Sequence, residues 1–175
     1  MKKIILITGG QRSGKSMYAE RLALSLTDQP IYFATARIWD EEFKERVKRH
    51  QARRGDNWTN IEEEKYLSQH TIYNKVCVVD CITLWCTNFF FDANQNNPKE
   101  PVIDKALDAI KKEFDQFTAQ DATFIFVTNE IGSGGVSDNV VQRRFTDMEG
   151  WMNQYVASKA DEVVLMVSGI PVKIK

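Results

Sequence analysis

Residues 8–16 read TGGQRSGKS, and from Gly9 onward they match the pattern G-x-x-x-x-G-K-[ST]. An apolar run over residues 4–7 precedes the match, and a helical pattern over residues 17–26 follows it. A strand, a glycine-rich turn and a helix, in that order, are what a phosphate-binding loop requires. The sequence therefore predicts a P-loop near the N-terminus of this chain.

Each residue type in this loop contributes to phosphate binding. Glycine lets backbone amides approach a phosphate without a Cβ clash, and a helix N-terminus adds unpaired N–H groups. We expect Lys15 to reach the β- and γ-phosphates and the Ser16 hydroxyl to hold Mg²⁺. The residues assigned here to nucleotide binding are Gly9, Gly10, Gln11, Arg12, Ser13, Gly14, Lys15 and Ser16.

Length and composition exclude several classes of protein. With 175 residues the chain is expected to form one domain, 1–175. A net charge of -1 disfavours a nucleic-acid binder, and no apolar stretch is long enough to span a membrane. The apolar N-terminal run is too short for a signal peptide, which predicts a cytoplasmic protein. Its three cysteines are expected to be reduced.

Strand-like and helix-like segments alternate along the chain, which predicts an α/β fold of the P-loop NTPase type. We expect a mainly parallel sheet flanked by helices, with an antiparallel strand at its C-terminal edge. The predicted strands are residues 4–8, 31–34, 58–64, 76–80, 123–128, 162–167 and 172–174. The predicted helices are residues 16–26, 40–53, 82–91, 102–117 and 139–158, with a loop over 92–101.

Polar residues follow several predicted strands at the edge where nucleotides bind in open α/β sheets. Besides Lys15 these are Thr35, Asp80 and the pair Asn129–Glu130. Asp80 ends a buried apolar strand, as does the carboxylate that supports Mg²⁺ in P-loop NTPases. The alternative is that Asp80 caps the helix beginning near Ile82, because Asp is a favoured N-cap.

The chain has two histidines. His50 lies in a strongly basic segment, where helical spacing places it on one face with Phe43, Arg46, Val47 and Arg54. It is either a functional imidazole or a histidine on an ordinary packed or solvated face. His70 lies in a polar stretch and is interpreted as a surface residue.

Several blocks, in order and spanning nearly the whole chain, resemble the bifunctional adenosylcobinamide kinase/adenosylcobinamide-phosphate guanylyltransferase family. The first is residues 8–16, similar to the TGGxRSGKS start of that family. The others are ATA at 34–36, RVKRHQARR at 46–54 with Trp58 and Glu62, DCIT at 80–83, VTNEIG at 127–132 and VSGIPVKIK at 167–175.

The resemblance implies two reactions. ATP or GTP phosphorylates adenosylcobinamide; then GTP guanylylates a histidine, here His50, and the GMP passes to adenosylcobinamide phosphate. Mg²⁺ is the implied cofactor, with Ser16 and Asp80 as its ligands, and Lys15 and His50 are the catalytic residues. The nucleotide contacts implied beyond the P-loop are Ala34, Thr35, Ala36, Gln51, Ala52, Arg53, Arg54, Glu62 and Asp80.

The resemblance also implies a homotrimer, and the aromatic residues Phe89, Phe90, Phe91 and Trp151 suggest surface available for contacts. Two other functions stay open at this point. One is a P-loop small-molecule kinase that forms no covalent histidine intermediate. The other is a nucleotide-binding regulator without chemistry.

Overall fold

One seven-stranded sheet organises the molecule, in the order β3-β2-β4-β5-β1-β6-β7. The structure is a computed structural model that describes residues 1–38, 41, 45, 54–99 and 101–175. The strands are β1 (Lys3–Thr8), β2 (Ile31–Ala34), β3 (Thr59–Glu62), β4 (Val76–Asp80), β5 (Thr123–Val127), β6 (Glu162–Val167) and β7 (Ile170–Lys173). The helices are α1 (Lys15–Leu26), α3 (Ile82–Ala93), α4 (Asp104–Phe117) and α5 (Val140–Lys159), with 3-10 turns at Leu67–Gln69 and Gly132–Gly134.

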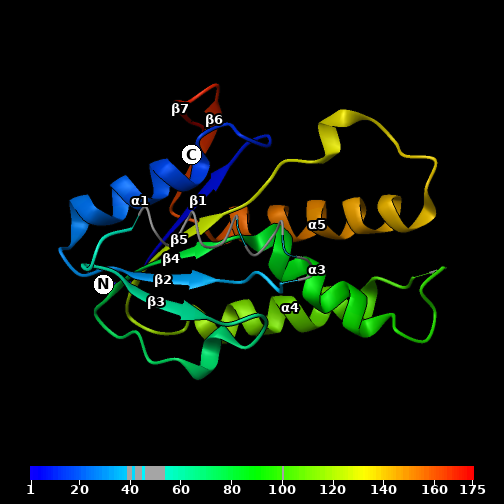
Figure 1. The fold of residues 1–175 in the computed structure, drawn as a ribbon, viewed down its shortest axis with the longest axis horizontal. Coiled ribbons are helices and arrows are strands. Elements are labelled where there is room, and N and C mark those ends of the chain that lie inside the picture. The colour runs from blue at the N-terminus through cyan, green and yellow to red at the C-terminus, as the bar shows by residue number, and fades with distance from the viewer. Residues whose placement is uncertain (39–40, 42–44, 46–53, 100) are drawn as a thin grey trace.

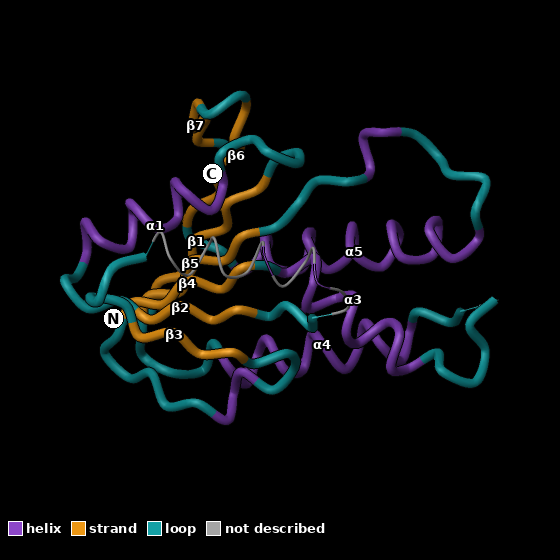
Figure 2. The backbone as a smooth tube through the Cα atoms, viewed as in Figure 1, coloured by secondary structure: helices purple, strands orange, loops and turns teal. Residues whose placement is uncertain are grey.

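All strand pairs are parallel except β6 with β7, which is antiparallel and lies at the edge. The predicted α/β fold, with its antiparallel C-terminal edge strand, is therefore confirmed. Because the strands run the same way, their carboxyl ends share one edge, where the chain enters α1 and α3 (Figures 1 and 2).

Helices cover both faces of the sheet, and this explains the unbroken apolar runs in the strands. Ile4 and Leu6 of β1 belong to the cluster that packs against α3, α4 and α5. Ile5 and Ile7 belong to the opposite cluster, which includes Ala19 of α1. Successive strand residues point to opposite faces, so a strand covered on both sides needs apolar residues at every position.

The helix after β4 is longer than predicted. It continues through Asp92 to Ala93, so the predicted loop begins later. Phe89 and Phe90 pack in the core, whereas Phe91 and Trp151 are exposed. The interpretation of Phe89 and Phe90 as contact surface is therefore wrong, because α3 turns that side toward α4 and α5.

Two further expectations are tested by the fold. All three cysteines are free and buried, as predicted. No helix in the described part of the chain is long and apolar enough to cross a membrane.

Candidate nucleotide site

The P-loop joins β1 to α1 in a conformation that only its glycines allow. Gly9 has φ +147°, and a Cβ there would lie 2.6 Å from the Met166 backbone oxygen. Gly14 has φ +95° and forms the N-cap of α1 without a side-chain cap. The first amides of α1 are therefore left for a ligand, which is the arrangement that binds phosphate.

Lys15 lies across this loop. Its side chain is buried, and Nζ donates to the Gly10 oxygen at 2.6 Å and to Ser13 Oγ at 3.4 Å. Burial lowers the Lys15 pKa, and the nearby acidic groups Cys81, Asp80 and Glu149 oppose that shift. The ammonium is thus held at the centre of the loop, where a phosphate would replace the carbonyl as its partner.

A cavity of about 860 Å³ opens beside the loop at the carboxyl edge of the sheet. Ten of the residues assigned from the sequence line it: Gln11, Arg12, Ser13, Gly14, Lys15, Ser16, Ala34, Ala36, Arg54 and Asp80. The structure therefore brings together segments that are as much as 69 residues apart in the sequence, from Gln11 to Asp80.

Other assigned residues do not line this cavity. Gly9 and Gly10 form the turn itself. Thr35 is fully buried, and its hydroxyl donates to the Cys81 oxygen at 2.8 Å and accepts from the Cys81 amide at 2.9 Å. Its role in the structure is to join the ends of β2 and β4. Glu62 ends β3, next to Ala34 in the sheet, and is exposed.

Asp80 is not the cap of α3. The N-cap of that helix is Cys81, and no side chain caps it. Asp80 Oδ2 instead accepts a hydrogen bond of 2.7 Å from the Tyr32 hydroxyl. The helix-cap interpretation of Asp80 is therefore wrong, and the carboxylate faces the cavity.

The oxygen atoms in this cavity suit Mg²⁺. Ser16 and Asp80 both line it, and hydroxyl and carboxylate oxygens are the ligands that Mg²⁺ takes in phosphate-transfer sites. Among the described residues no group of three or more His, Cys, Asp or Glu side chains could hold a metal. Mg²⁺ in phosphate-transfer sites is usually bound through one or two protein ligands and substrate phosphates.

Arg54 also lines this cavity. Its guanidinium carbon lies 3.5 Å from the centroid of the Tyr32 ring, and Nε donates to Asn60 Oδ1 at 2.8 Å. Nη1 is buried and has no hydrogen-bond partner in the described part of the chain, with Glu20 Oε1 3.8 Å away. A buried guanidinium with an unused donor is suited to binding an anionic group.

A buried polar link that the sequence did not reveal supports the far side of the cavity. Thr83 Oγ1 donates to Glu149 Oε1 at 2.5 Å and accepts from the Asn129 amide at 3.0 Å. Glu149 is fully buried in α5, and burial raises its pKa to about 7. Its Oε2 has no hydrogen-bond partner among the described residues. The only sequence signal was an acidic residue between Met148 and Met152 in an otherwise apolar stripe.

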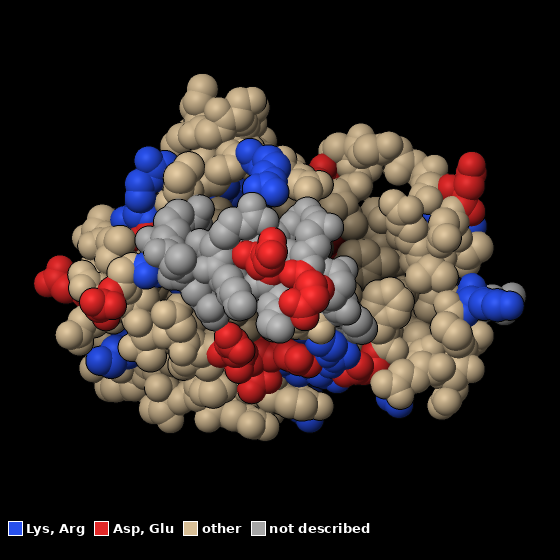
Figure 3. Space-filling model, viewed as in Figure 1, with Lys and Arg blue, Asp and Glu red and all other residues tan. Residues whose placement is uncertain are grey.

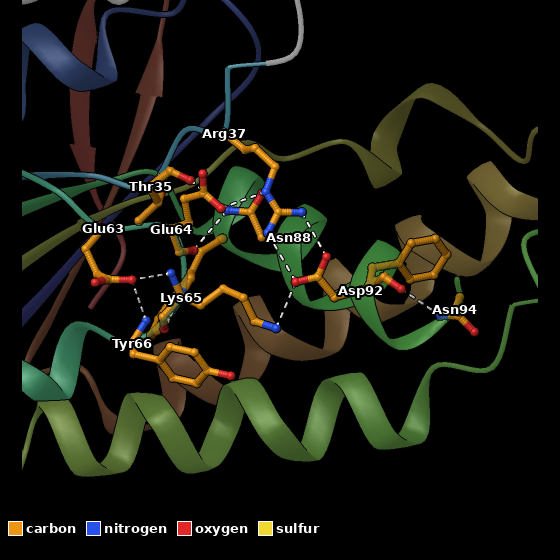
Figure 4. A network of polar contacts seen from close by, with 11 residues as sticks. Thr35, Arg37, Glu63, Glu64, Lys65, Tyr66, Asn88, Asp92 and Asn94 are labelled. Carbon is orange, nitrogen blue, oxygen red and sulfur yellow. Dashed lines mark hydrogen bonds and ion pairs between the residues drawn. The ribbon is translucent and has the colours of Figure 1, made fainter. Parts of the chain in front are cut away.

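Ion pairs hold the chain where it leaves β2 (Figure 4). Arg37 binds Glu64 at 2.6 Å and Asp92 at 2.8 Å, and Lys65 Nζ lies 3.0 Å from the same Asp92 carboxylate. The hydrogen bonds from Arg37 are the main reason that the Asp92 pKa falls to about 2. Asn88 of α3 adds hydrogen bonds to the Thr35 and Glu64 backbone oxygens. The segment that precedes Trp39 is thus fixed to α3.

The structure describes one of the two histidines, His70. His50 lies outside the described residues, as do Gln51, Ala52 and Arg53. His70 is half-buried; its ring packs edge-on to Phe33 at 5.4 Å, and Nε2 lies 3.5 Å from Glu63 Oε2. Its side chain is 33% exposed, so His70 lies at the surface as predicted, with its ring packed against Phe33 of β2.

Sequence comparison agrees with this geometry. Residues 5–174 match the family model described as cobinamide kinase/cobinamide phosphate guanyltransferase. The chain belongs to this family. It is 38% identical to the bifunctional adenosylcobalamin biosynthesis protein CobU of Escherichia coli, over 98% of this chain and 99% of that one. It is 34% identical to CobP of Pseudomonas aeruginosa, named in the same way, over 97% and 96% of the two chains.

Structural comparison confirms the fold on separate grounds. An ATPase of a bacterial type III secretion system superimposes with a TM-score of 0.57 at 12% identity, over 94% of this chain. The match covers 51% of the secretion ATPase, so it concerns the nucleotide-binding fold alone. Family members are bifunctional enzymes, a kinase and a guanylyltransferase.

Proposed function

We propose that this chain phosphorylates adenosylcobinamide with ATP or GTP and then transfers GMP from GTP, through guanylylated His50, to adenosylcobinamide phosphate. The product is adenosyl-GDP-cobinamide. One observation carries the proposal: a chain that matches the family over residues 5–174 builds a cavity from its P-loop, Asp80 and Arg54.

In the kinase step, the P-loop amides and Lys15 hold the β- and γ-phosphates. The substrate hydroxyl attacks the γ-phosphorus in line and loses its proton to solvent. The bond between the γ-phosphorus and the β-γ bridging oxygen breaks, and the nucleoside diphosphate leaves. When bound by Ser16 and Asp80, Mg²⁺ supplies positive charge that screens the phosphates. Because Lys15 is already buried at the centre of the loop, binding requires its ammonium only to exchange the Gly10 oxygen for a phosphate oxygen.

In the guanylyl transfer, a neutral imidazole nitrogen of His50 attacks the α-phosphorus of GTP. The bond to the pyrophosphate oxygen breaks, and a phosphoramidate forms. A phosphate oxygen of adenosylcobinamide phosphate then attacks the same phosphorus and releases the imidazole. Arg54 follows His50 by four residues, and its buried Nη1, which makes no hydrogen bond among the described residues, supports a role in binding the transferring phosphate.

The proposed assembly is a homotrimer, and this rests on the family resemblance. Of the aromatic residues first taken as contact surface, Phe91 and Trp151 are exposed, and Phe91 is the one that we assign to contact between copies. A molar mass of three chains by light scattering at micromolar concentration is expected, and the mass of a single chain would contradict it.

Labelling with GTP tests the covalent step. We expect GTP and Mg²⁺ to add one GMP to the intact protein, on an acid-labile and base-stable bond that maps to His50. His50→Ala should lose the label and guanylyl transfer, yet keep phosphorylation of adenosylcobinamide. His70→Ala is the matched control and should label normally.

Other outcomes favour the alternatives. Phosphorylation of adenosylcobinamide without any protein label would support a kinase with no covalent histidine. Binding of GTP without turnover of any substrate would support a nucleotide-binding regulator. A label that maps to a lysine would contradict the role given to His50.

A further inference from the structure

A second hollow adjoins the nucleotide cavity, between the loop of residues 131–138 and α5. It has a volume of about 540 Å³. In Figure 1 this loop arches over α5, and Figure 3 shows the surface hollowed in that part of the molecule. The side chains that matter for its chemistry are Val136, Val140, Arg144, Asp147, Trp151 and Gln154. We call it the α5 groove.

The loop that forms one wall of the α5 groove is tied at both ends. Glu130 accepts hydrogen bonds from the Gly132 and Ser133 amides at 2.9 and 3.2 Å. At the other end, Arg143 Nη1 donates to the Ser137 and Asp138 oxygens at 2.7 and 2.9 Å. The groove is therefore held in shape by the fold.

Helix α5 forms the other wall and is anchored to the nucleotide site through its inner face. Asn153 accepts from the Thr128 hydroxyl at 2.7 Å and donates to the Asn129 oxygen at 3.2 Å, and both partners follow β5 directly. Buried Glu149 makes the bond to Thr83 described above. With its inner face fixed in this way, α5 presents the opposite side, including Trp151, to the groove.

The groove and the nucleotide cavity share a wall. Glu130, Ile131 and Gly134 line the nucleotide cavity, whereas Gly132 and Gly135 of the same loop line the groove. In both proposed reactions an oxygen of the acceptor must come into line with a phosphate of the nucleotide or of the guanylylated histidine. The acceptor must therefore bind directly beside the nucleotide cavity.

We propose that the α5 groove binds the corrinoid acceptor, adenosylcobinamide and its phosphate, with Trp151 packed against the corrin ring. This inference rests on the proposed function. The P-loop binds the nucleotide, and the groove would bind the second substrate, the corrinoid.

The lining suits such an acceptor. Cobinamide is a broad, flat macrocycle with an apolar ring and amide groups around its edge. Val136, Val140 and Trp151 are 87%, 40% and 46% exposed, so the groove offers uncovered apolar surface to a ligand. Asp147 and Gln154 are placed to bond peripheral amides, and Arg144 supplies a cation for the phosphate of the second acceptor.

Binding of purified adenosylcobinamide phosphate, measured by equilibrium dialysis without nucleotide, tests the inference. Trp151→Ala should weaken binding roughly tenfold, the scale of losing one well-packed aromatic contact, and raise the KM for the acceptor similarly. The KM for GTP and labelling of the protein by GTP should stay unchanged. Tyr73→Ala is the matched control, since Tyr73 is 59% exposed and precedes β4, at the amino ends of the parallel strands and away from the groove.

A second variant distinguishes binding of the corrin ring from binding of the acceptor's phosphate. Arg144→Met should weaken binding of adenosylcobinamide phosphate several-fold more than binding of adenosylcobinamide. Unchanged acceptor affinity in both variants would overturn the inference. So would a change in molar mass by light scattering in Trp151→Ala, because the groove would then be a contact between copies of this chain.

The test separates this inference from the proposed function. If the unmodified protein neither labels with GTP nor acts on adenosylcobinamide, the proposed function fails, and the inference fails with it. If the unmodified protein does both, and the two variants bind the acceptor as tightly as it does, only the assignment of the groove fails.

Discussion

Replacing buried Glu149 by glutamine should make stability less sensitive to pH. The Glu149 pKa is raised from its ordinary 4.5 to about 7, chiefly because burial disfavours the charged form. Between those pH values the folded state keeps a proton that the unfolded state has lost. The free energy of unfolding therefore falls as pH rises from about 4.5 to 7, and the loss is complete above that window.

The size of the effect follows from the shift. A displacement of about 2.5 pKa units, which already includes the opposing effect of nearby Lys15, corresponds to about 3 kcal/mol. Glutamine is neutral at every pH and still accepts the Thr83 hydroxyl bond through Oε1. Its amide nitrogen replaces Oε2, which has no partner among the described residues.

Urea unfolding at pH 5 and pH 8 measures the difference. Glu149→Gln should match the unmodified protein at pH 5 within about 1 kcal/mol and exceed it by about 2–3 kcal/mol at pH 8. In a chain of this length that equals a rise in Tm of roughly 4–12 °C. Asp147→Asn, an exposed change on the same helix, controls for the loss of one acidic side chain. A stability difference that is equal at the two pH values would refute the reasoning.

Three further changes test the nucleotide site. Lys15→Ala should lower both half-reactions by about 10²-fold or more, since an oriented buried charge is removed; near-normal kinase turnover would contradict the P-loop assignment. Asp80→Asn should raise the Mg²⁺ concentration needed for half-maximal activity, with nucleotide binding in EDTA little changed, and an unmoved Mg²⁺ titration would count against it. Tyr32→Phe keeps the ring beneath Arg54 but removes the hydroxyl bonded to Asp80, so Mn²⁺ affinity measured by EPR with bound GDP should fall several-fold. Tyr18→Phe, on α1, is its control, and equal Mn²⁺ affinities would remove Tyr32 from the metal site.

Much of this protein was predictable from its sequence, because the signals are local. Continuous apolar runs such as residues 4–7 identify strands covered on both faces, and the pattern at residues 9–16 needs only its own glycines and the adjoining helix to form the loop. Asp80 was found by the same logic, since a carboxylate at the end of a parallel strand reaches the ligand edge wherever that strand lies in the sheet.

Other features depended on which elements meet. Aromatic residues such as Phe89 and Phe90 occur both in cores and in contact surfaces, so the sequence does not distinguish the two. The packing of α3 against α4 and α5 buries them. The same holds for three features of the site, each of which joins segments that are far apart in the sequence. They are the stacking of Arg54 on Tyr32, the bond between Thr83 and Glu149, and the groove next to Trp151. The hydrophobic pattern of a sequence indicates whether one segment forms a helix or a strand, and it does not say which elements pack together. Burial, pKa shifts and cavities arise where two or more elements touch, and that is decided only when the tertiary structure forms.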